Sequence, residues 1–148
     1  MTDPDLIIRD AEANDIDSIM ALENGSIEHP WTKDAIEDLI NSENKVCLVI
    51  EADNKVLCYV GAETVLDECN IGNIVTDKDY RGRGLGTKMM TSLMEELRRR
   101  GIKKVFLEVE HDNLPAIALY EKQGFTRYGQ RRGYYGPGKD AILMTKDL

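Results

Sequence analysis

The alternation of apolar and polar residues changes its period along the chain, and these changes mark the predicted elements. Where apolar residues recur at intervals of three and four, the pattern predicts amphipathic helices. Where β-branched and apolar residues run together between turn residues, it predicts strands. The predicted order is β-α-α-β-β-β-α-β-α-β-β, which indicates an α/β fold with a mixed, mostly antiparallel sheet flanked by helices.

Polar caps and glycines mark the ends of the predicted helices. We expect the first helix to begin with Asn14 as its N-cap and the second to begin at Thr32. The third helix follows a glycine-rich loop and ends at Gly101, and the fourth runs from Asn113 as its cap to Gly124 as its stop. The third helix has the longest apolar stripe, formed by Leu85, Met89, Met90, Leu93, Met94 and Leu97.

The predicted strands begin with a short one over residues 6–9. Three more, separated by turn residues, predict an antiparallel meander over 46–76. A strand over 103–110 and a closing pair after residue 125 follow the last two helices. Because no linker, repeat or low-complexity segment interrupts the 148 residues, we expect one domain over residues 1–148 with a single core.

Composition and charge exclude several classes of protein. The net charge is −8, so the chain should repel nucleic acid and anionic membranes and favour a basic partner. The sequence has no leader-like start, and no apolar run approaches the ~20 residues that span a bilayer, so we expect a soluble cytoplasmic protein. Cys47, Cys58 and Cys69 form no Cys-x-x-Cys pair and have no histidine partner, which predicts buried cysteines and no metal site.

The stretch "TDKDYRGRGLGTK" from Thr76 to Lys88 places three glycines between a predicted strand and a predicted helix. Such a loop presents unpaired backbone N–H groups, and the helix dipole adds positive potential at the same place. Arg81, Arg83 and Lys88 make the loop locally cationic on an acidic chain. The pattern therefore predicts a binding site for a small anion, with phosphate as its natural ligand.

The loop matches other phosphate-binding patterns less well. A P-loop requires Gly-Lys-Ser/Thr, and Gly86-Thr87-Lys88 has the wrong order. A dinucleotide fingerprint follows its strand directly, whereas "TDKDYR" intervenes here, although Glu108 lies about where that fold keeps its ribose-binding acid. An RNA-binding arginine-glycine tract is disfavoured by the acidic chain and the single short copy. A nucleotide-binding dehydrogenase remains a minor alternative.

The segment "RGRGLG" resembles the Arg/Gln-x-x-Gly-x-Gly/Ala pyrophosphate loop of the GCN5-related N-acetyltransferase (GNAT) family, whose fold has a similar order of elements. The segments "HPW", "VLDE", "NIVTDKDYRGRGLG", "LEVE", "NLPAIALYEKQGF", "RRGYY" and "DAILM" resemble the RimI group of that family. That group acetylates the N-terminal alanine of the eighteenth protein of the small ribosomal subunit. One departure is Gly82, a position often held by a larger residue, so no side chain at 82 can contact the ligand.

The resemblance implies that acetyl-CoA is the co-substrate. In the family, the backbone of the glycine loop holds the pyrophosphate, and the strand before the loop holds the pantetheine arm where it diverges from its neighbour. The helix cap after the next strand also contacts the cofactor. The positions of this chain that match are Ile74, Val75, Thr76, Arg81, Gly82, Arg83, Gly84, Leu85, Gly86, Thr87 and Asn113.

The resemblance also assigns catalytic roles to two residues. Acetylation requires a neutral amine, and a peptide α-amine with a pKa of about 7.7–8.0 needs a general base near neutral pH. Glu108, which alternates with Phe106 and Glu110 on one face of its strand, matches the proton acceptor of the family. Tyr120, on the following helix, matches the proton donor to the leaving thiolate. We assign no such role to Glu110.

The resemblance also predicts the acceptor amine and the pocket that binds it. The resemblance implies transfer of acetyl to the α-amine of an N-terminal alanine of a basic, ribosomal protein, in a narrow pocket lined by Trp31, Tyr134 and Tyr135, without direct binding of nucleic acid or membrane. Within the family, the alternative is a small amine or a lysine side chain. Outside it, besides the dehydrogenase, the alternative is a non-catalytic CoA-binding module, which would need neither Glu108 nor Tyr120.

Overall fold

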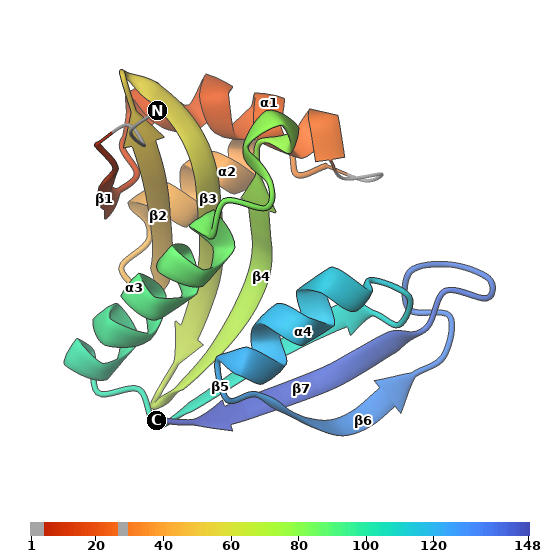
Figure 1. Cartoon of the computed structure of the whole chain (residues 1–148). Coiled ribbons are helices and arrows are strands. Elements are labelled where there is room, and N and C mark those ends of the chain that lie inside the picture. Colours follow the sequence, from red (N-terminus) through yellow and green to blue (C-terminus); the bar gives the residue numbers. More distant parts are fainter. Residues whose placement is uncertain (1–4, 27–29) are drawn as a thin grey trace.

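The computed structural model describes residues 5–26 and 30–148. In this part of the chain one sheet has the strand order β1-β2-β3-β4-β5-β7-β6 (Figure 1). The strands are β1 (Ile7–Asp10), β2 (Lys45–Ala52), β3 (Lys55–Val65), β4 (Glu68–Thr76), β5 (Lys104–Glu110), β6 (Thr126–Arg131) and β7 (Ala141–Asp147). The helices are α1 (Ile16–Ser26), α2 (Lys33–Asn41), α3 (Leu85–Arg99) and α4 (Leu114–Lys122). The predicted order of helices and strands is confirmed.

Neighbouring strands run antiparallel except for β4 and β5, which are parallel and are connected through α3. A parallel pair needs a long crossover connection, and α3 supplies it. The mostly antiparallel sheet is therefore confirmed. The dehydrogenase alternative is wrong, because a dinucleotide-binding fold is built on a mostly parallel sheet.

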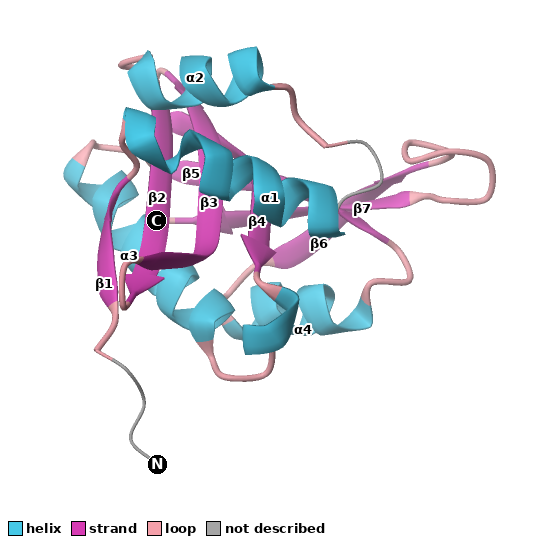
Figure 2. Ribbon diagram, turned by 90° about the horizontal axis from the view of Figure 1, so that it is seen from above, coloured by secondary structure: helices cyan, strands magenta, loops and turns pink. Residues whose placement is uncertain are grey.

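The helices cover both faces of the sheet, with α1 and α2 on one face and α3 and α4 on the other (Figure 2). Alternate residues of β2 show the two layers. Val46 and Leu48 pack in the cluster that contains α3, whereas Cys47 and Val49 pack in the cluster with α1 and α2. This alternation is the two-residue period of a strand buried on both faces.

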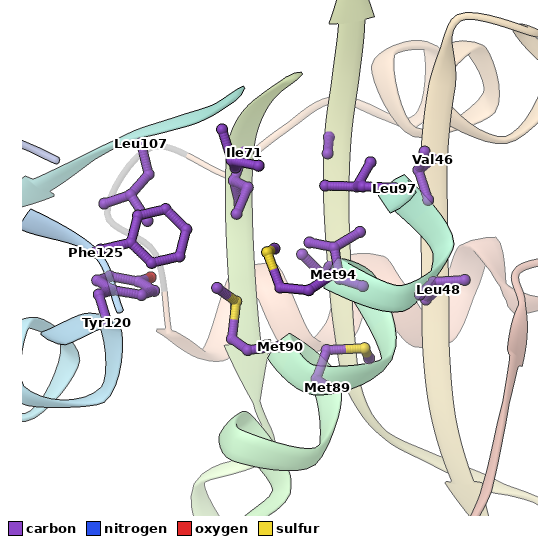
Figure 3. Close-up of a cluster of buried hydrophobic side chains, with 14 of the residues drawn as sticks. Val46, Leu48, Ile71, Met89, Met90, Met94, Leu97, Leu107, Tyr120 and Phe125 are labelled. Carbon is purple, nitrogen blue, oxygen red and sulfur yellow. The ribbon is translucent and has the colours of Figure 1, made fainter. Parts of the chain in front are cut away.

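The apolar stripe of α3 forms the centre of the larger cluster, and all six of its predicted residues are buried. Figure 3 shows Met89, Met90, Met94 and Leu97 of this helix against side chains of β2 and β4. The three cysteines are buried and free, as predicted. None of the helices in residues 5–26 and 30–148 is long and apolar enough to cross a lipid bilayer.

The prediction that Asn14 caps the first helix is wrong. Residues Ala13–Asp15 form a 3-10 turn with Glu12 as its cap, and α1 begins only at Ile16. The cause is Asp15, whose carboxylate accepts hydrogen bonds from the backbone of Glu12 and from Arg9 on β1. A contact with a strand therefore decides where this helix begins, and a local capping rule cannot include it. The predicted start of the second helix at Thr32 is confirmed, and the structure adds that Thr32 is its N-cap, since its side chain accepts a hydrogen bond from the Ala35 N–H.

Candidate functional site

Strands β4 and β5 pair over only part of their length. Their ladder joins Glu68–Ile71 to Lys104–Leu107 and stops there, although β4 continues to Thr76 and β5 to Glu110. Figure 1 shows the two strands diverging beyond this point. Alternate residues of 72–76 therefore direct backbone N–H and C=O groups into the gap rather than to a strand. The divergence expected for the "NIVT" strand is confirmed.

The glycine loop lies at the end of this diverging strand. Gly82 and Gly84 have φ of 76° and 81°, in the left-handed region that glycine occupies without strain. A Cβ at either position would meet no atom within 4 Å. Gly84 is the N-cap of α3, and the first intrahelical bond runs from the Lys88 N–H to its carbonyl. The N–H groups of Leu85–Thr87 precede that bond and are available to a ligand.

Two arginines lie within the loop, on either side of Gly82. The Arg83 guanidinium lies over the ring of Tyr80, 4.9 Å from its centroid, and Arg81 Nε donates to the carbonyl of Thr76 at 3.4 Å. Their positive charge adds to the dipole of α3, so the loop is suited to a phosphate or pyrophosphate.

The third glycine of the loop, Gly86, has a different local role: a Cβ at this position would lie 3.1 Å from the Leu119 side chain of α4. Gly86 therefore lets α3 begin close against α4, a packing role that the sequence did not reveal.

A cleft of about 650 Å³ lies beside the gap and brings together four predicted residues: Trp31, Glu108, Tyr134 and Tyr135. Trp31 packs against the backbone of Gly72 on β4, where a Cβ would lie 3.2 Å from its ring. The rings of Tyr134 and Tyr135 meet edge to face, with centroids 4.9 Å apart. His29, in the predicted "HPW" segment, lies outside the described residues.

The loop that carries the two tyrosines is held by Asp140, which the sequence analysis missed. Its carboxylate accepts hydrogen bonds from the Gly133 N–H at 2.8 Å and from Gln130 Nε2 at 2.9 Å. These bonds hold the pKa of Asp140 below its usual value, with the Gly133 N–H as the main cause. The signal in the sequence was an aspartate just after a glycine-rich turn, a place where carboxylates commonly bind nearby backbone N–H groups.

Glu108 and Tyr120 lie on opposite faces of the sheet. Glu108 lines the cleft, just past the last residue of β5 that pairs with β4, whereas Tyr120 packs in the layer of α3 and α4 (Figure 3). The predicted alternation of β5 is confirmed, with Val105, Leu107 and Val109 buried on the far face. The gap between β4 and β5 opens beside Glu108 and lies between the two faces of the sheet.

The environment of Tyr120 favours its neutral form. The side chain is 7% exposed, and its ring lies 6.0 Å from that of Phe125. Burial is the main cause that raises the pKa of Tyr120 above its usual value, and the neighbouring Tyr135 adds a smaller effect. The pKa of Tyr135 is raised to about 12, mainly by burial and to a smaller extent by the nearby Tyr134, Glu108 and Glu110. Tyr135 thus lines the cleft and lies close enough to Tyr120 to affect its pKa.

A buried carboxylate behind the gap was also missed. Glu23 of α1 is fully buried, and its Oε1 accepts hydrogen bonds from the Tyr59 hydroxyl and from Asn73 Nδ2. Its signal in the sequence was a charge on the apolar face of a helix, seven residues after Ile16.

Asn113 caps α4 as predicted, since its side-chain oxygen accepts a hydrogen bond from the Ala116 N–H at 3.3 Å. Among the described residues, no group of three histidine, cysteine or acidic side chains could hold a metal ion.

Known proteins resemble this chain in sequence and in fold. Residues 16–125 match the Acetyltransferase (GNAT) family. The chain is 34% identical to the [ribosomal protein bS18]-alanine N-acetyltransferase of Salmonella typhimurium, over 88% of this chain and 89% of that protein. The Escherichia coli protein of the same name is 32% identical over 93% and 94%. The crystal structure of the ribosomal-protein-S18-alanine N-acetyltransferase from E. coli superimposes with a TM-score of 0.89 and 31% identity, covering 97% of this chain and 94% of that one.

Proposed function

Since the chain belongs to the acetyltransferase (GNAT) family, we propose that it transfers acetyl from acetyl-CoA directly to the α-amine of an N-terminal alanine. The observation that carries this proposal is the gap between β4 and β5, which links the glycine loop to the aromatic cleft. A donor held at the loop and an acceptor held in the cleft can meet there. The relatives from Salmonella and E. coli are named for alanine acetylation of ribosomal protein bS18, which makes a basic ribosomal protein the favoured acceptor.

The residues at the loop fit the donor. The free N–H groups of Leu85–Thr87 and the open space beside Gly82 and Gly84 suit the pyrophosphate. The backbone of Ile74, Val75 and Thr76 borders the gap and offers donors and acceptors to the pantetheine arm. Asn113 retains its amide N–H groups for a contact, because only its oxygen caps α4. Acetyl-CoA supplies an acetyl group activated as a thioester.

Glu108 is the proposed proton acceptor. It is partly buried at the point where the cleft meets the gap, so an acceptor amine in the cleft lies within its reach directly or through one water. The α-amine has a pKa of about 7.7–8.0, within reach of a carboxylate base near neutral pH, whereas lysine at about 10.4 is much harder to deprotonate. This difference favours a peptide terminus over a lysine side chain.

Tyr120 is the proposed donor to the leaving sulfur. Because burial raises its pKa, complete proton transfer to a thiolate with a pKa near 8.5 is unfavourable. A hydrogen bond from the neutral phenol stabilises the departing thiolate without that transfer. The proton acquired by Glu108 can then reach solvent through the open cleft.

Trp31, Tyr134 and Tyr135 are the proposed acceptor pocket. Their rings come from the segment before α2 and from the β6–β7 loop, and all three line the cleft beside the gap. Aromatic walls leave room for a small first side chain such as alanine. The sheet extends from residue 7 to residue 147 without a second layer of strands among the described residues, which supports a single catalytic domain.

The test is the release of free CoA thiol from acetyl-CoA with three acceptors. A hexapeptide that begins with alanine should support rapid release, whereas the same peptide with its α-amine blocked should support none. Spermidine at equal concentration should react poorly. Equal rates with spermidine and the open peptide would contradict the preference for a protein terminus, and no release with any amine would contradict the proposed function.

A further inference from the structure

The cleft does not end at Glu108 but continues along the sheet to the turn between β3 and β4, near the C-terminus in Figure 1. Glu63, Val65 and Glu68 line this part of the cleft together with Phe106. The strand register places these side chains on one face of the sheet. Val65 lies opposite Glu68, and Glu63 lies opposite Asn70. Asn70 in turn lies opposite Phe106 on β5. The acceptor pocket described above uses none of these side chains.

The turn exposes two apolar side chains and has a strained backbone. Leu66 is 94% exposed and Val65 60% exposed, and Leu66 has a φ of 55°. A leucine in the left-handed region is less stable than glycine or asparagine would be. Its side chain also buries almost nothing within this chain. The fold therefore does not account for leucine at this position, whereas contact with another molecule would.

Two carboxylates beside the turn, Glu63 and Glu68, form no close ion pair among the described residues. Two lysines lie opposite these carboxylates in the strand register, and each also pairs with another carboxylate: Lys45 faces Glu63 and pairs with Asp38, and Lys104 faces Glu68 and pairs with Asp147 at 3.8 Å. The Asp38 hydrogen bond raises the pKa of Lys45, and the charge of Glu63 adds to this effect. Four carboxylates thus share two lysines, and the surface presents an excess of negative charge next to exposed apolar side chains. A basic and partly apolar polypeptide complements it.

The distance between the β3–β4 turn and Glu108 determines which residues of an acceptor polypeptide could reach the turn. Glu68 pairs with Lys104, four residues before Glu108 on the same strand. At about 3.3 Å per residue the two positions are roughly 13 Å apart. An extended acceptor with its amine at Glu108 would therefore place its fourth to sixth residues at the turn.

We propose that Glu63, Val65, Leu66 and Glu68 form a distal acceptor subsite that binds residues four to six of an extended, basic acceptor polypeptide. Glu63 and Glu68 receive its basic side chains, and Val65 and Leu66 contact its apolar ones. The inference rests on the proposed function, and it assigns to that function a determinant of acceptor sequence well beyond the terminal alanine.

The test compares two acceptors that share their first three residues, a tripeptide and an octapeptide with arginine and phenylalanine at positions four to six. The variants are Glu63→Gln/Glu68→Gln and Leu66→Asn, since asparagine tolerates a positive φ. Each should raise the KM of the octapeptide by about fivefold or more with kcat unchanged. The KM of the tripeptide should stay the same. Glu95→Gln, an exposed carboxylate on α3, is the matched control and should change neither constant.

The outcomes separate the two ideas. Equal effects of the variants on both peptides, or no effect on the octapeptide, would overturn the distal subsite while leaving the acetyltransferase reaction in place. Failure of the unmodified protein to acetylate either peptide would overturn the proposed function and this inference together. The thermal midpoint of Leu66→Asn should not fall, so a higher KM cannot be attributed to loss of folded protein.

Discussion

Asn73 of β4 donates a 2.9 Å hydrogen bond to the buried carboxylate of Glu23 on α1, at the point where β4 leaves β5. The Tyr59 hydroxyl donates to the same oxygen at 2.8 Å, and the other oxygen, Oε2, has no partner among the described residues. Burial, followed by the charge of Glu23, raises the pKa of Tyr59, so its hydroxyl remains a donor. This network ties α1 to the half of β4 that borders the gap.

Removal of Glu23 should therefore destabilise the protein. Glu23→Ala leaves two buried donors without an acceptor and opens a cavity, and we expect the free energy of unfolding to fall by about 2–5 kcal/mol. Glu23→Gln keeps the accepting oxygen and should cost about 1 kcal/mol or less. Urea denaturation of both variants measures the difference. Equal losses would mean that the negative charge, rather than the accepting oxygen, matters.

Stability should also depend on pH through Asp15. The Arg9 guanidinium donates two hydrogen bonds to this buried carboxylate, at 2.7 and 2.9 Å, and holds its pKa below the usual value. A depressed pKa in the folded state gives stability that is present above the unfolded pKa of about 3.9 and is lost as pH falls through the folded value. Asp15→Asn should cost about 1–3 kcal/mol at pH 7, and less as the pH approaches 2. Urea denaturation at both pH values tests this, and a constant difference would exclude the linkage.

The glycine loop can be tested with two glycines of the same conformation. Gly84 and Gly101 have φ of 81° and 80°, and a Cβ at either would meet open space. Alanine at each should lower stability by about 1–2 kcal/mol. Only Gly84→Ala should weaken binding of acetyl-CoA, by about tenfold or more, because its Cβ enters the space beside the helix N-terminus. Titration calorimetry with acetyl-CoA would contradict the assignment if both variants bound it equally well.

Glu108 has a matched control on its own strand face. Glu108→Gln should leave binding of acetyl-CoA unchanged and lower kcat by about 10²–10⁴-fold near neutral pH, whereas Glu110→Gln should have little effect. Alkaline pH should restore part of the rate, because the acceptor amine deprotonates by itself above about pH 8. The raised pKa of Tyr120 keeps its phenol protonated in that range. A deficit of Glu108→Gln that is constant with pH would mean that the carboxylate only positions the acceptor.

Local patterns predicted most of the fold because they depend on neighbours in the sequence. The stripe of α3, the start of the second helix at Thr32, the Asn113 cap and the alternation of β5 all have this origin. The start of α1 was missed because it depends on Arg9, in a different element. The packing of Gly86 against Leu119 was missed for the same reason.

The candidate site could be predicted only in part. Resemblance to a family supplied Glu108 and Tyr120, but the sequence could not show that they lie on opposite faces of the sheet beside the gap between β4 and β5. The Glu23 network combines residues from α1, β3 and β4, and no local pattern relates them. Asp140 was likewise missed, because its partners lie seven and ten residues before it across a turn.

The most direct measurement locates the acetyl group on a peptide that offers two amines. An octapeptide with an N-terminal alanine and one internal lysine is incubated with the protein and acetyl-CoA, and its fragments are analysed by mass spectrometry. We expect acetyl on the alanine α-amine, an unmodified lysine, and one CoA thiol released per acetyl group. Acetyl on the lysine with a free terminus would contradict the proposed transfer to the α-amine.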